Sequence, residues 1–191
     1  SSQQALQMIT QARKEGLPIT ADTAIHHLYL TEMDIGQFNP NSHVIPPLRT
    51  ERDRTGLIEG VCSGAIQALC SDHQPHDDDA KAAPFEETEP GISGLETLLP
   101  LTLRLAKEQH LPLIDALATV TCNPASILGL QSGTLSPGAP ANITLFNPDT
   151  WWTVRADQLL SAGKNSPFLN WELQGRVTHT LLNGAIVYEA P

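Results

Sequence analysis

The first half of the chain alternates between helix-like and strand-like patterns of apolar residues. Apolar side chains recur every three or four positions in residues 1–16 and 50–61, which is typical of helices that cover a core with one face. Short, mostly apolar runs follow at 17–22 and 65–71. Both predict strands, and the second predicts a strand buried on both faces. A helix followed by a strand, twice in succession, indicates an α/β fold with a parallel sheet and covering helices.

Polar residues mark the ends of these predicted helices. Ser1 and Gln4 have capping-box spacing at the start of the first helix, and Gly16 is a common stop signal after its end. Thr50, three residues before Asp53, has the place of an N-cap for the second helix.

Two long connections interrupt the pattern. Residues 31–47 contain Gly36, Asn39-Pro40-Asn41 and Pro46-Pro47 and predict a long loop, and long loops in compact domains often carry function. Residues 77–91 are acidic, proline-flanked and without a hydrophobic period. We interpret this second segment as a mobile lid over a site, with a solvated surface excursion as the alternative.

Helical periodicity returns after residue 92. Ser93 and Glu96 have capping-box spacing, and apolar residues recur with helical period after them. Pro100 lies inside this predicted helix, so we expect it to kink or split the helix. A further helix is expected over 112–121.

The pattern changes again at Gly133. Residues 133–148 predict a short, hairpin-like β segment. Residues 176–188 predict a β-hairpin around Asn183-Gly184, because Asn-Gly is the strongest short hairpin signal. We therefore expect a small β module over 132–191, attached to an α/β part over 1–131.

Composition narrows the classes of function. The 191 residues carry a formal net charge of −10, which argues against nonspecific binding to nucleic acid or to an anionic membrane. No apolar run reaches the length of a membrane-spanning helix. The three cysteines form no CxxC pair and predict buried thiols in a reducing, cytoplasmic setting. The chain begins at Ser1 without Met or a signal peptide, so we expect it to be part of a longer protein.

Asp72 is the main candidate for chemistry. It directly follows the predicted strand 65–71, and His73 and His76 lie on the loop that leaves this strand. In α/β barrels and open parallel sheets, functional residues gather at the C-terminal ends of the strands. We therefore predict that Asp72 is a metal ligand or a proton carrier. The alternative is that Asp72 caps a turn and that both histidines are solvated.

The adjacent His26 and His27 are a weaker candidate. They follow the predicted strand 17–22, and neighbouring residues on a strand point in opposite directions, so both rarely bind one ion. We favour a structural role, or support of a nearby ligand, over metal binding by this pair.

Taken together, these segments resemble the later part of a bacterial-type dihydroorotase of the cyclic amidohydrolase superfamily. The resemblance follows the family's order of motifs and covers essentially the whole chain. It is carried by His26-His-Leu-x-Leu-Thr31, Pro46-Pro-Leu-Arg-Thr50, Ser71-Asp-His-Gln-Pro-His76, Lys81, Pro90-Gly-Ile-Ser-Gly-Leu-Glu-Thr97, Leu99-Pro-Leu101, Gly133-x-Leu-x-Pro-Gly-Ala139 and Leu182-Asn-Gly184.

The resemblance implies a fold and a reaction. Residues 1–131 would be the last strands and helices of a (β/α)8 TIM-type barrel, and residues 132–191 part of a β-sandwich module. The full-length parent would be a zinc-dependent enzyme of pyrimidine biosynthesis that converts N-carbamoyl-L-aspartate reversibly into dihydroorotate. The family also suggests a cytoplasmic homodimer that acts on a small molecule, without nucleic acid or membrane partners.

The resemblance assigns roles to five residues. Asp72 would be a metal ligand and proton shuttle, His76 would contact a substrate carboxylate, and the Pro90-Gly91 backbone would line the same pocket. Ile45 stands where the family has a substrate-binding asparagine. The other metal ligands are expected upstream of Ser1, so this piece alone should not hold the zinc.

Departures from the family keep alternatives open. An apolar Ile45 cannot make the hydrogen bonds of asparagine. Some dihydroorotase-like chains are non-catalytic partners of aspartate carbamoyltransferase, and the sequences around His43 and His73 resemble that group. A hydantoinase or allantoinase is a third candidate, although the block from Pro90 to Thr97 matches it less well.

Overall fold

The computed structural model describes residues 1–190 and divides into two compact units. The first unit combines residues 1–98 with 154–171, and the second combines residues 99–153 with the chain from 172 onward. The expected boundary near residue 132 stays a prediction.

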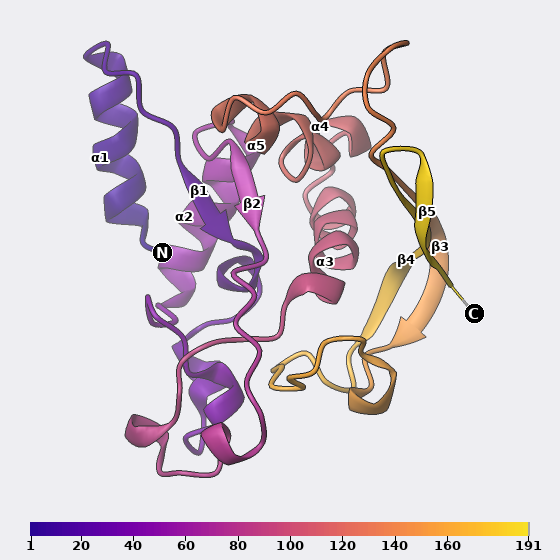
Figure 1. Ribbon diagram of the computed structural model, residues 1–191. Coiled ribbons are helices and arrows are strands. Elements are labelled where there is room, and N and C mark those ends of the chain that lie inside the picture. The colour runs from indigo at the N-terminus through magenta and orange to yellow at the C-terminus, as the bar shows by residue number, and fades with distance from the viewer. Residues whose placement is uncertain (191) are drawn as a thin grey trace. The chain divides into compact units, whose positions relative to one another are not determined.

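The first unit contains two parallel strands and two helices (Figure 1). In chain order they are α1 (Gln3–Lys14), β1 (Asp22–Ala24), α2 (Glu51–Cys62) and β2 (Ala68–Cys70). Strands β1 and β2 pair in parallel, with Asp22 opposite Ala68 and Ala24 opposite Cys70. The α/β class and the parallel pairing predicted from the sequence are therefore confirmed.

Strand β1 is shorter and later than predicted. Residues 17–21 are outside any strand, and Leu17 and Ile19 are exposed. Pro18 also lacks the N–H that a ladder needs, so this part of the apolar run does not pair. Strand β2 likewise covers only Ala68–Cys70 of the predicted run 65–71.

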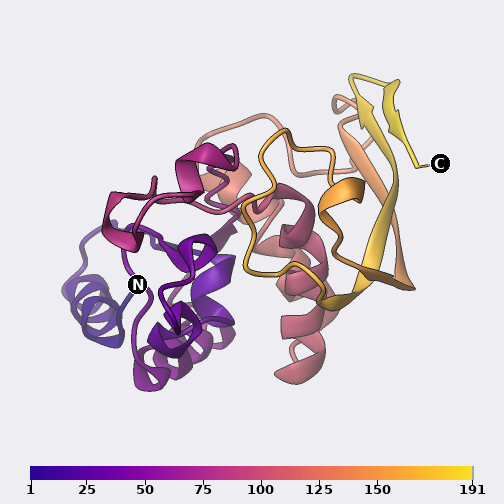
Figure 2. The ribbon, with the colours of Figure 1, turned by 90° about the horizontal axis from the view of Figure 1, so that it is seen from below.

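Helices α1 and α2 lie side by side (Figures 1 and 2). Gly56 on α2 makes this approach possible, since a Cβ there would lie 2.8 Å from the Cβ of Gln3. Thr50 caps α2 as predicted and accepts a hydrogen bond from the Asp53 amide at 3.3 Å. The cap of α1 is Ser2, not Ser1, and its hydroxyl accepts from the Ala5 amide.

The two long connections contain short helical turns. The turns of 3-10 type in the chain are η1 (Ile25–Leu28), η2 (Glu32–Ile35), η3 (Pro40–Ser42), η4 (Asp79–Lys81), η5 (Phe85–Glu87) and η6 (Ala156–Gln158). Two of them, η4 and η5, lie in the acidic segment 77–91.

The core of the first unit draws on distant parts of the sequence. Ile25 and Leu28 after β1 are fully buried, and so are Val154 and Phe168 from the segment 154–171. Phe168 meets the ring of Trp171 edge-on, with centroids 5.1 Å apart. Burial of such large apolar side chains anchors the segment 154–171 in this unit.

The second unit holds a three-stranded antiparallel sheet, whose strands are labelled in Figure 1. Its strands are β3 (Ile143–Thr153), β4 (Glu172–Leu182) and β5 (Ala185–Glu189), in that spatial order. The hairpin between β4 and β5 is confirmed, because Asn183 and Gly184 both adopt positive φ (49° and 83°), as a type I′ turn requires. The expected local hairpin within 133–148 is wrong, since β3 pairs instead with β4.

The helices of the second half differ from prediction in detail. Helices α3 (Leu95–Glu108), α4 (Leu113–Ala118) and α5 (Cys122–Ile127) are present, and α3 continues through Pro100 without being split. Ser93 and Glu96 do not form a capping box. The Ser93 amide donates to the Asn165 carbonyl oxygen, and the Glu96 carboxylate accepts from the Leu160 amide at 2.7 Å.

Two sequence-level expectations about burial can be compared with the structure. Cys62 and Cys122 are exposed and Cys70 is half-buried, so the expectation of buried thiols was wrong. Within residues 1–190, none of the helices combines the length and the apolar character needed to cross a membrane.

Candidate functional site

The C-terminal ends of β1 and β2 bring the candidate residues to one edge. Ala24 and Cys70 are opposite each other in the parallel register, and His26 and Asp72 each come two residues later. Because parallel strands end at the same side of a sheet, both side chains leave the sheet at the edge where α/β proteins place their sites.

Asp72 adopts a backbone conformation that few residues tolerate. Its φ is +44°, in the left-handed region where Asp and Asn are enriched among residues with a side chain. The half-buried carboxylate accepts a hydrogen bond at 3.1 Å from the side-chain amide of Gln74. Among the residues described, no backbone N–H donates to this carboxylate, so Asp72 does not act as a turn cap here.

His26 and His27 are buried together beside this edge. They lie in the turn η1 rather than on a strand, so their rings do not point apart and their centroids are 4.5 Å from each other. The premise that strand geometry separates the two rings is therefore wrong, because the chain turns immediately after β1.

The electrostatics of the pair keep both imidazoles neutral. Burial lowers the pKa of His26 to about 4. Burial, together with the neighbouring His26, lowers the pKa of His27 to about 3, against an opposing attraction to Asp72. Neither ring nitrogen of His26 has a hydrogen-bond partner within residues 1–190. Both nitrogens are covered by atoms of this chain, and leaving buried polar atoms unpaired costs free energy.

The structure brings together His76, Pro90 and Gly91. The Nε2 atom of His76 lies 3.1 Å from the carbonyl oxygen of Pro90. Gly91 has φ +141°, and a Cβ at this position would lie 2.5 Å from the Cβ of Gln74 and 3.2 Å from His76 Nε2. Only glycine fits such a close approach, so Gly91 lets its backbone pack directly against Gln74 and the imidazole of His76.

Lys81 lies in the acidic segment 77–91 and makes hydrogen bonds from a buried position. Its side chain is buried, and its ammonium group donates to the carbonyl oxygens of Pro40, Glu89 and Gly91 at 3.1, 2.5 and 3.1 Å. Burial lowers the pKa of Lys81. The segment 77–91 is therefore tied to the loop 31–47, which makes it more than a solvated excursion.

Ile45 belongs to the same loop. Two residues before it, the carbonyl oxygen of His43 accepts from the Gly91 amide at 2.8 Å, so the chain around Ile45 is joined to the Gly91 backbone. The Ile45 side chain itself is 66% exposed and contributes little to the core.

Asn165 is a contact residue that the sequence reasoning missed. Its side-chain oxygen accepts from the His76 amide at 2.8 Å, and its side-chain nitrogen donates to the carbonyl oxygens of Gln74 and Gly91, both at 3.0 Å. The only local signal is the polar Asn-Ser-Pro at 165–167, which reads as a turn.

The residues described do not complete a metal site. Residues 1–190 contain no group of three or more His, Cys, Asp or Glu side chains arranged to hold a metal ion. Asp72 and the unpaired nitrogens of His26 have the chemistry of metal ligands, but zinc sites commonly use three or four protein ligands. Any metal at this edge would need further ligands from elsewhere.

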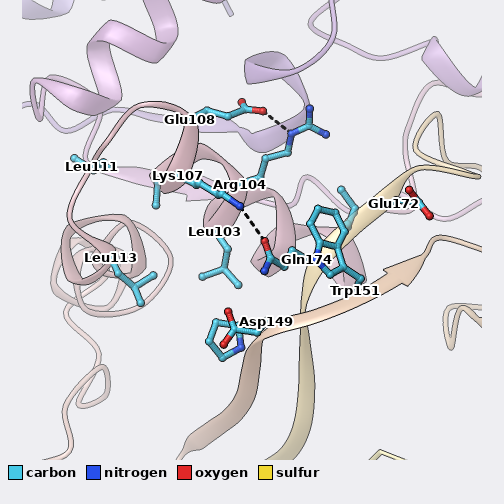
Figure 3. Close-up of a pocket in the computed structure, with 13 residues that line it drawn as sticks. Leu103, Arg104, Lys107, Glu108, Leu111, Leu113, Asp149, Trp151, Glu172 and Gln174 are labelled. Carbon is cyan, nitrogen blue, oxygen red and sulfur yellow. Dashed lines mark hydrogen bonds and ion pairs between the residues drawn. The ribbon is translucent and has the colours of Figure 1, made fainter.

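A separate groove lies within the second unit (Figure 3). It has a volume of about 750 Å³ and is lined by α3, β3 and β4, with Trp151 62% exposed. Three of its charged side chains have partners: Arg104 pairs with Glu108 at 2.7 Å, and Lys107 Nζ lies 3.5 Å from Gln174 Oε1. None of the predicted site residues lines this groove.

Comparison with known proteins gives three kinds of similarity. Residues 6–187 match the Amidohydrolase family. The chain is 43% identical to a dihydroorotase of Geobacter metallireducens, over 99% of the chain and 45% of that protein. It is 45% identical to a dihydroorotase-like protein of Pseudomonas putida, over 98% of the chain and 44% of that protein. The chain thus spans just under half the length of these relatives.

Solved structures agree on the fold. An L-hydantoinase (dihydropyrimidinase) from Arthrobacter aurescens matches with a TM-score of 0.89 and 29% identity, over 99% of this chain and 43% of that one. A dihydroorotase from Saccharomyces cerevisiae, solved with 5-fluoroorotic acid, matches with a TM-score of 0.75 and 22% identity, over 93% of this chain and 49% of that one.

Proposed function

This chain belongs to the amidohydrolase family, and on that premise we propose that it is the later part of a dihydroorotase. The full-length protein would close N-carbamoyl-L-aspartate reversibly to dihydroorotate. The observation that carries the proposal is the place of Asp72, two residues after β2 ends, at the edge where the parallel strands β1 and β2 both end. Curated relatives named dihydroorotase, at 39 to 43% identity over nearly the whole chain, support the choice of reaction.

For the fold, we propose that residues 1–131 form the last part of a (β/α)8 barrel and residues 132–191 part of a β-sandwich module. The parallel pair β1 and β2, with a helix before each strand, supports the first assignment. The antiparallel strands β3, β4 and β5 support the second. The structural similarity to the L-hydantoinase, which extends over 99% of this chain, supports both assignments.

For the metal, we propose zinc, with Asp72 as one of its ligands. A carboxylate at the C-terminal end of a parallel strand stands where α/β proteins place their sites, and carboxylates are among the ligands of zinc. When bound, zinc would activate water and polarise the amide carbonyl. The sequence-based expectation puts the further ligands upstream of Ser1. His26 and His27 are covered by atoms of this chain, which favours the structural role expected for them.

The other site residues would handle the substrate. Asp72, half-buried and without a strong cationic partner among the residues described, would take up and return a proton during ring opening and closure. His76 would hold a substrate carboxylate, and the backbone at Pro90 and Gly91, next to its imidazole, would line the same pocket. Ile45 would leave one substrate hydrogen bond unmade.

Two alternatives are weaker. A non-catalytic partner of aspartate carbamoyltransferase has Ile45 in its favour, but the retained Asp72 and the names of most curated relatives favour an enzyme. A hydantoinase shares the fold, but sequence identity is higher to the dihydroorotases. We expect a cytoplasmic homodimer, an expectation that sedimentation of the full-length protein would check.

The test is turnover by the full-length protein loaded with zinc. Ring opening of dihydroorotate is followed by its ultraviolet absorbance, with hydantoin and allantoin as competing substrates and a chelator as the control. We expect turnover of dihydroorotate that the chelator abolishes and zinc restores. A protein that carries stoichiometric zinc and turns over none of these compounds would contradict an enzymatic role, and preference for hydantoin would move it to the hydantoinases.

A further inference from the structure

We propose that Asn165 is a positioning residue for the substrate-binding loop. Together with Gly163 it would form a clamp that sets the place of His76 and of the Gly91 backbone. This inference rests on the proposed function, in which His76 and Gly91 face the substrate. Gly163 and Asn165 are not themselves among the residues proposed to contact the substrate or the metal.

The side chain of Asn165 is matched to three partners. Its oxygen accepts from the His76 amide, and its two N–H groups donate to the carbonyl oxygens of Gln74 and Gly91. A primary amide is the side chain that offers one acceptor and two donors in this short reach. Asn165 is 5% exposed, so all three bonds are made away from water, where they hold their geometry best.

The backbone of the same segment adds a second contact. A Cβ on Gly163 would lie 2.5 Å from the amide nitrogen and 2.6 Å from the carbonyl oxygen of His76. Residue 163 must therefore be glycine for the two backbones to touch. Gly163 and Asn165 thus contact the main chain of His76, and the imidazole of His76 lies beside the Pro90 carbonyl oxygen.

The clamp also connects the two parts of the proposed pocket, which are the loop that carries His76 and the backbone at Gly91. Asn165 and Lys81 both donate to the carbonyl oxygen of Gly91, at 3.0 and 3.1 Å. The backbone of Asn165 contributes once more, because its carbonyl oxygen accepts from the Ser93 amide at 2.8 Å. Loss of the Asn165 side chain should therefore release His76 and Gly91 together and leave the sheet edge at Asp72 in place.

The first test measures kinetics in the full-length protein. We expect Asn165→Ala to raise KM for dihydroorotate roughly 10-fold, with kcat changed less than about twofold, because binding geometry is lost and the proton carrier is not. Asn165→Asp should raise KM at least as much, since a carboxylate would face two carbonyl oxygens. Gln158→Ala removes an exposed amide from the same segment and should change neither constant.

The second test does not depend on activity. Hydrogen exchange of the full-length protein, read by mass spectrometry, should lose protection in peptides covering 74–78 and 89–93 in Asn165→Ala, and nowhere else. Unchanged exchange in these peptides, or an unchanged KM in an active protein, would overturn the inference. Loss of protection along the whole chain with a lower kcat would also overturn it, because it would make Asn165 a general stability residue.

The two tests separate the two proposals. If the wild-type protein has no turnover, the proposed function fails, and the exchange experiment still decides whether Asn165 clamps the loop. If Asn165→Ala does not fold, Asn165→Gln keeps the amide on a longer stem, and the same two measurements apply to it. A variant of this kind that folds and keeps both the wild-type KM and the wild-type exchange pattern would likewise count against the clamp.

Discussion

The rings of His26 and His27 lie 4.5 Å apart, in a buried turn at the end of β1. Two imidazoles this close can both be buried only while neutral, because a charge on either would be desolvated and would repel a charge on the other. The pair therefore links the stability of the fold to pH in a direction that can be worked out.

The first prediction is a loss of stability in mild acid. Burial lowers the pKa of His26 to about 4 and that of His27 to about 3, so between pH 6.5 and 4 the unfolded chain binds more protons than the folded one. The free energy of unfolding should therefore fall with falling pH, by about 1.4 kcal/mol per pH unit for each proton. Urea unfolding of the metal-free protein at several pH values measures this slope.

The matched variant for that experiment is His26→Gln. The substitution removes one titrating group. The number of protons taken up on unfolding in acid, which sets the change of unfolding free energy with pH, should therefore fall by about one. If the variant has the wild-type slope, the acid sensitivity has another source.

The second prediction concerns the carboxylate at the strand end. Asp72→Asn should lower kcat by about 10²–10⁴-fold while the unfolding midpoint stays near that of the wild type, because asparagine tolerates the positive φ of 44°. Asp72→Ala should lose the same activity and some stability besides. Steady-state kinetics and thermal unfolding check both variants, and an active Asp72→Asn protein would exclude Asp72 as the proton carrier.

The third prediction concerns Ile45. Ile45→Asn should raise kcat/KM for dihydroorotate about 5- to 10-fold, because one added hydrogen bond to substrate contributes about 1 kcal/mol. The side chain is 66% exposed, so the change should leave stability within about 0.5 kcal/mol. Ile45→Ser is the control, since its hydroxyl is too short to replace the amide. Equal kinetics for all three proteins would mean that position 45 does not contact substrate.

The fourth prediction concerns Lys81. Lys81→Met should lower the free energy of unfolding by about 2–4 kcal/mol, because three carbonyl oxygens lose a charged donor inside the protein. Lys107→Met removes a lysine at the surface of α3 and should cost less than about 0.5 kcal/mol. Denaturant unfolding compares the two, and similar losses would show that the Lys81 contacts add little.

The caps and turns that were predictable from the sequence are those whose signal lies within a few residues of the element itself. Thr50 caps α2, and Asn183-Gly184 turns the chain between β4 and β5, because both signals act through neighbouring backbone atoms. The resemblance also singled out Asp72, His76 and Gly91. In the structure Asp72 follows the end of β2, and His76 lies beside the backbone of Pro90 and Gly91, while their roles stay predictions.

Features decided by distant partners were not predictable. Residues 143–153 pair with a strand that begins about twenty residues after they end, and no local pattern distinguishes that from a nearby hairpin. Glu96 has capping-box spacing, yet its carboxylate accepts from Leu160. Asn165 contacts His76 across 89 positions of sequence, and its importance depends on that contact alone.

That separation has a consequence for how the protein is made. Synthesis proceeds from the N-terminus, so the His76 loop leaves the ribosome well before Asn165 has been added to the growing polypeptide. Until then the loop lacks its clamp and the core lacks Phe168. A nascent chain halted anywhere before residue 165 should therefore present an unformed binding loop, and competence for substrate should arise only after Asn165 has been added.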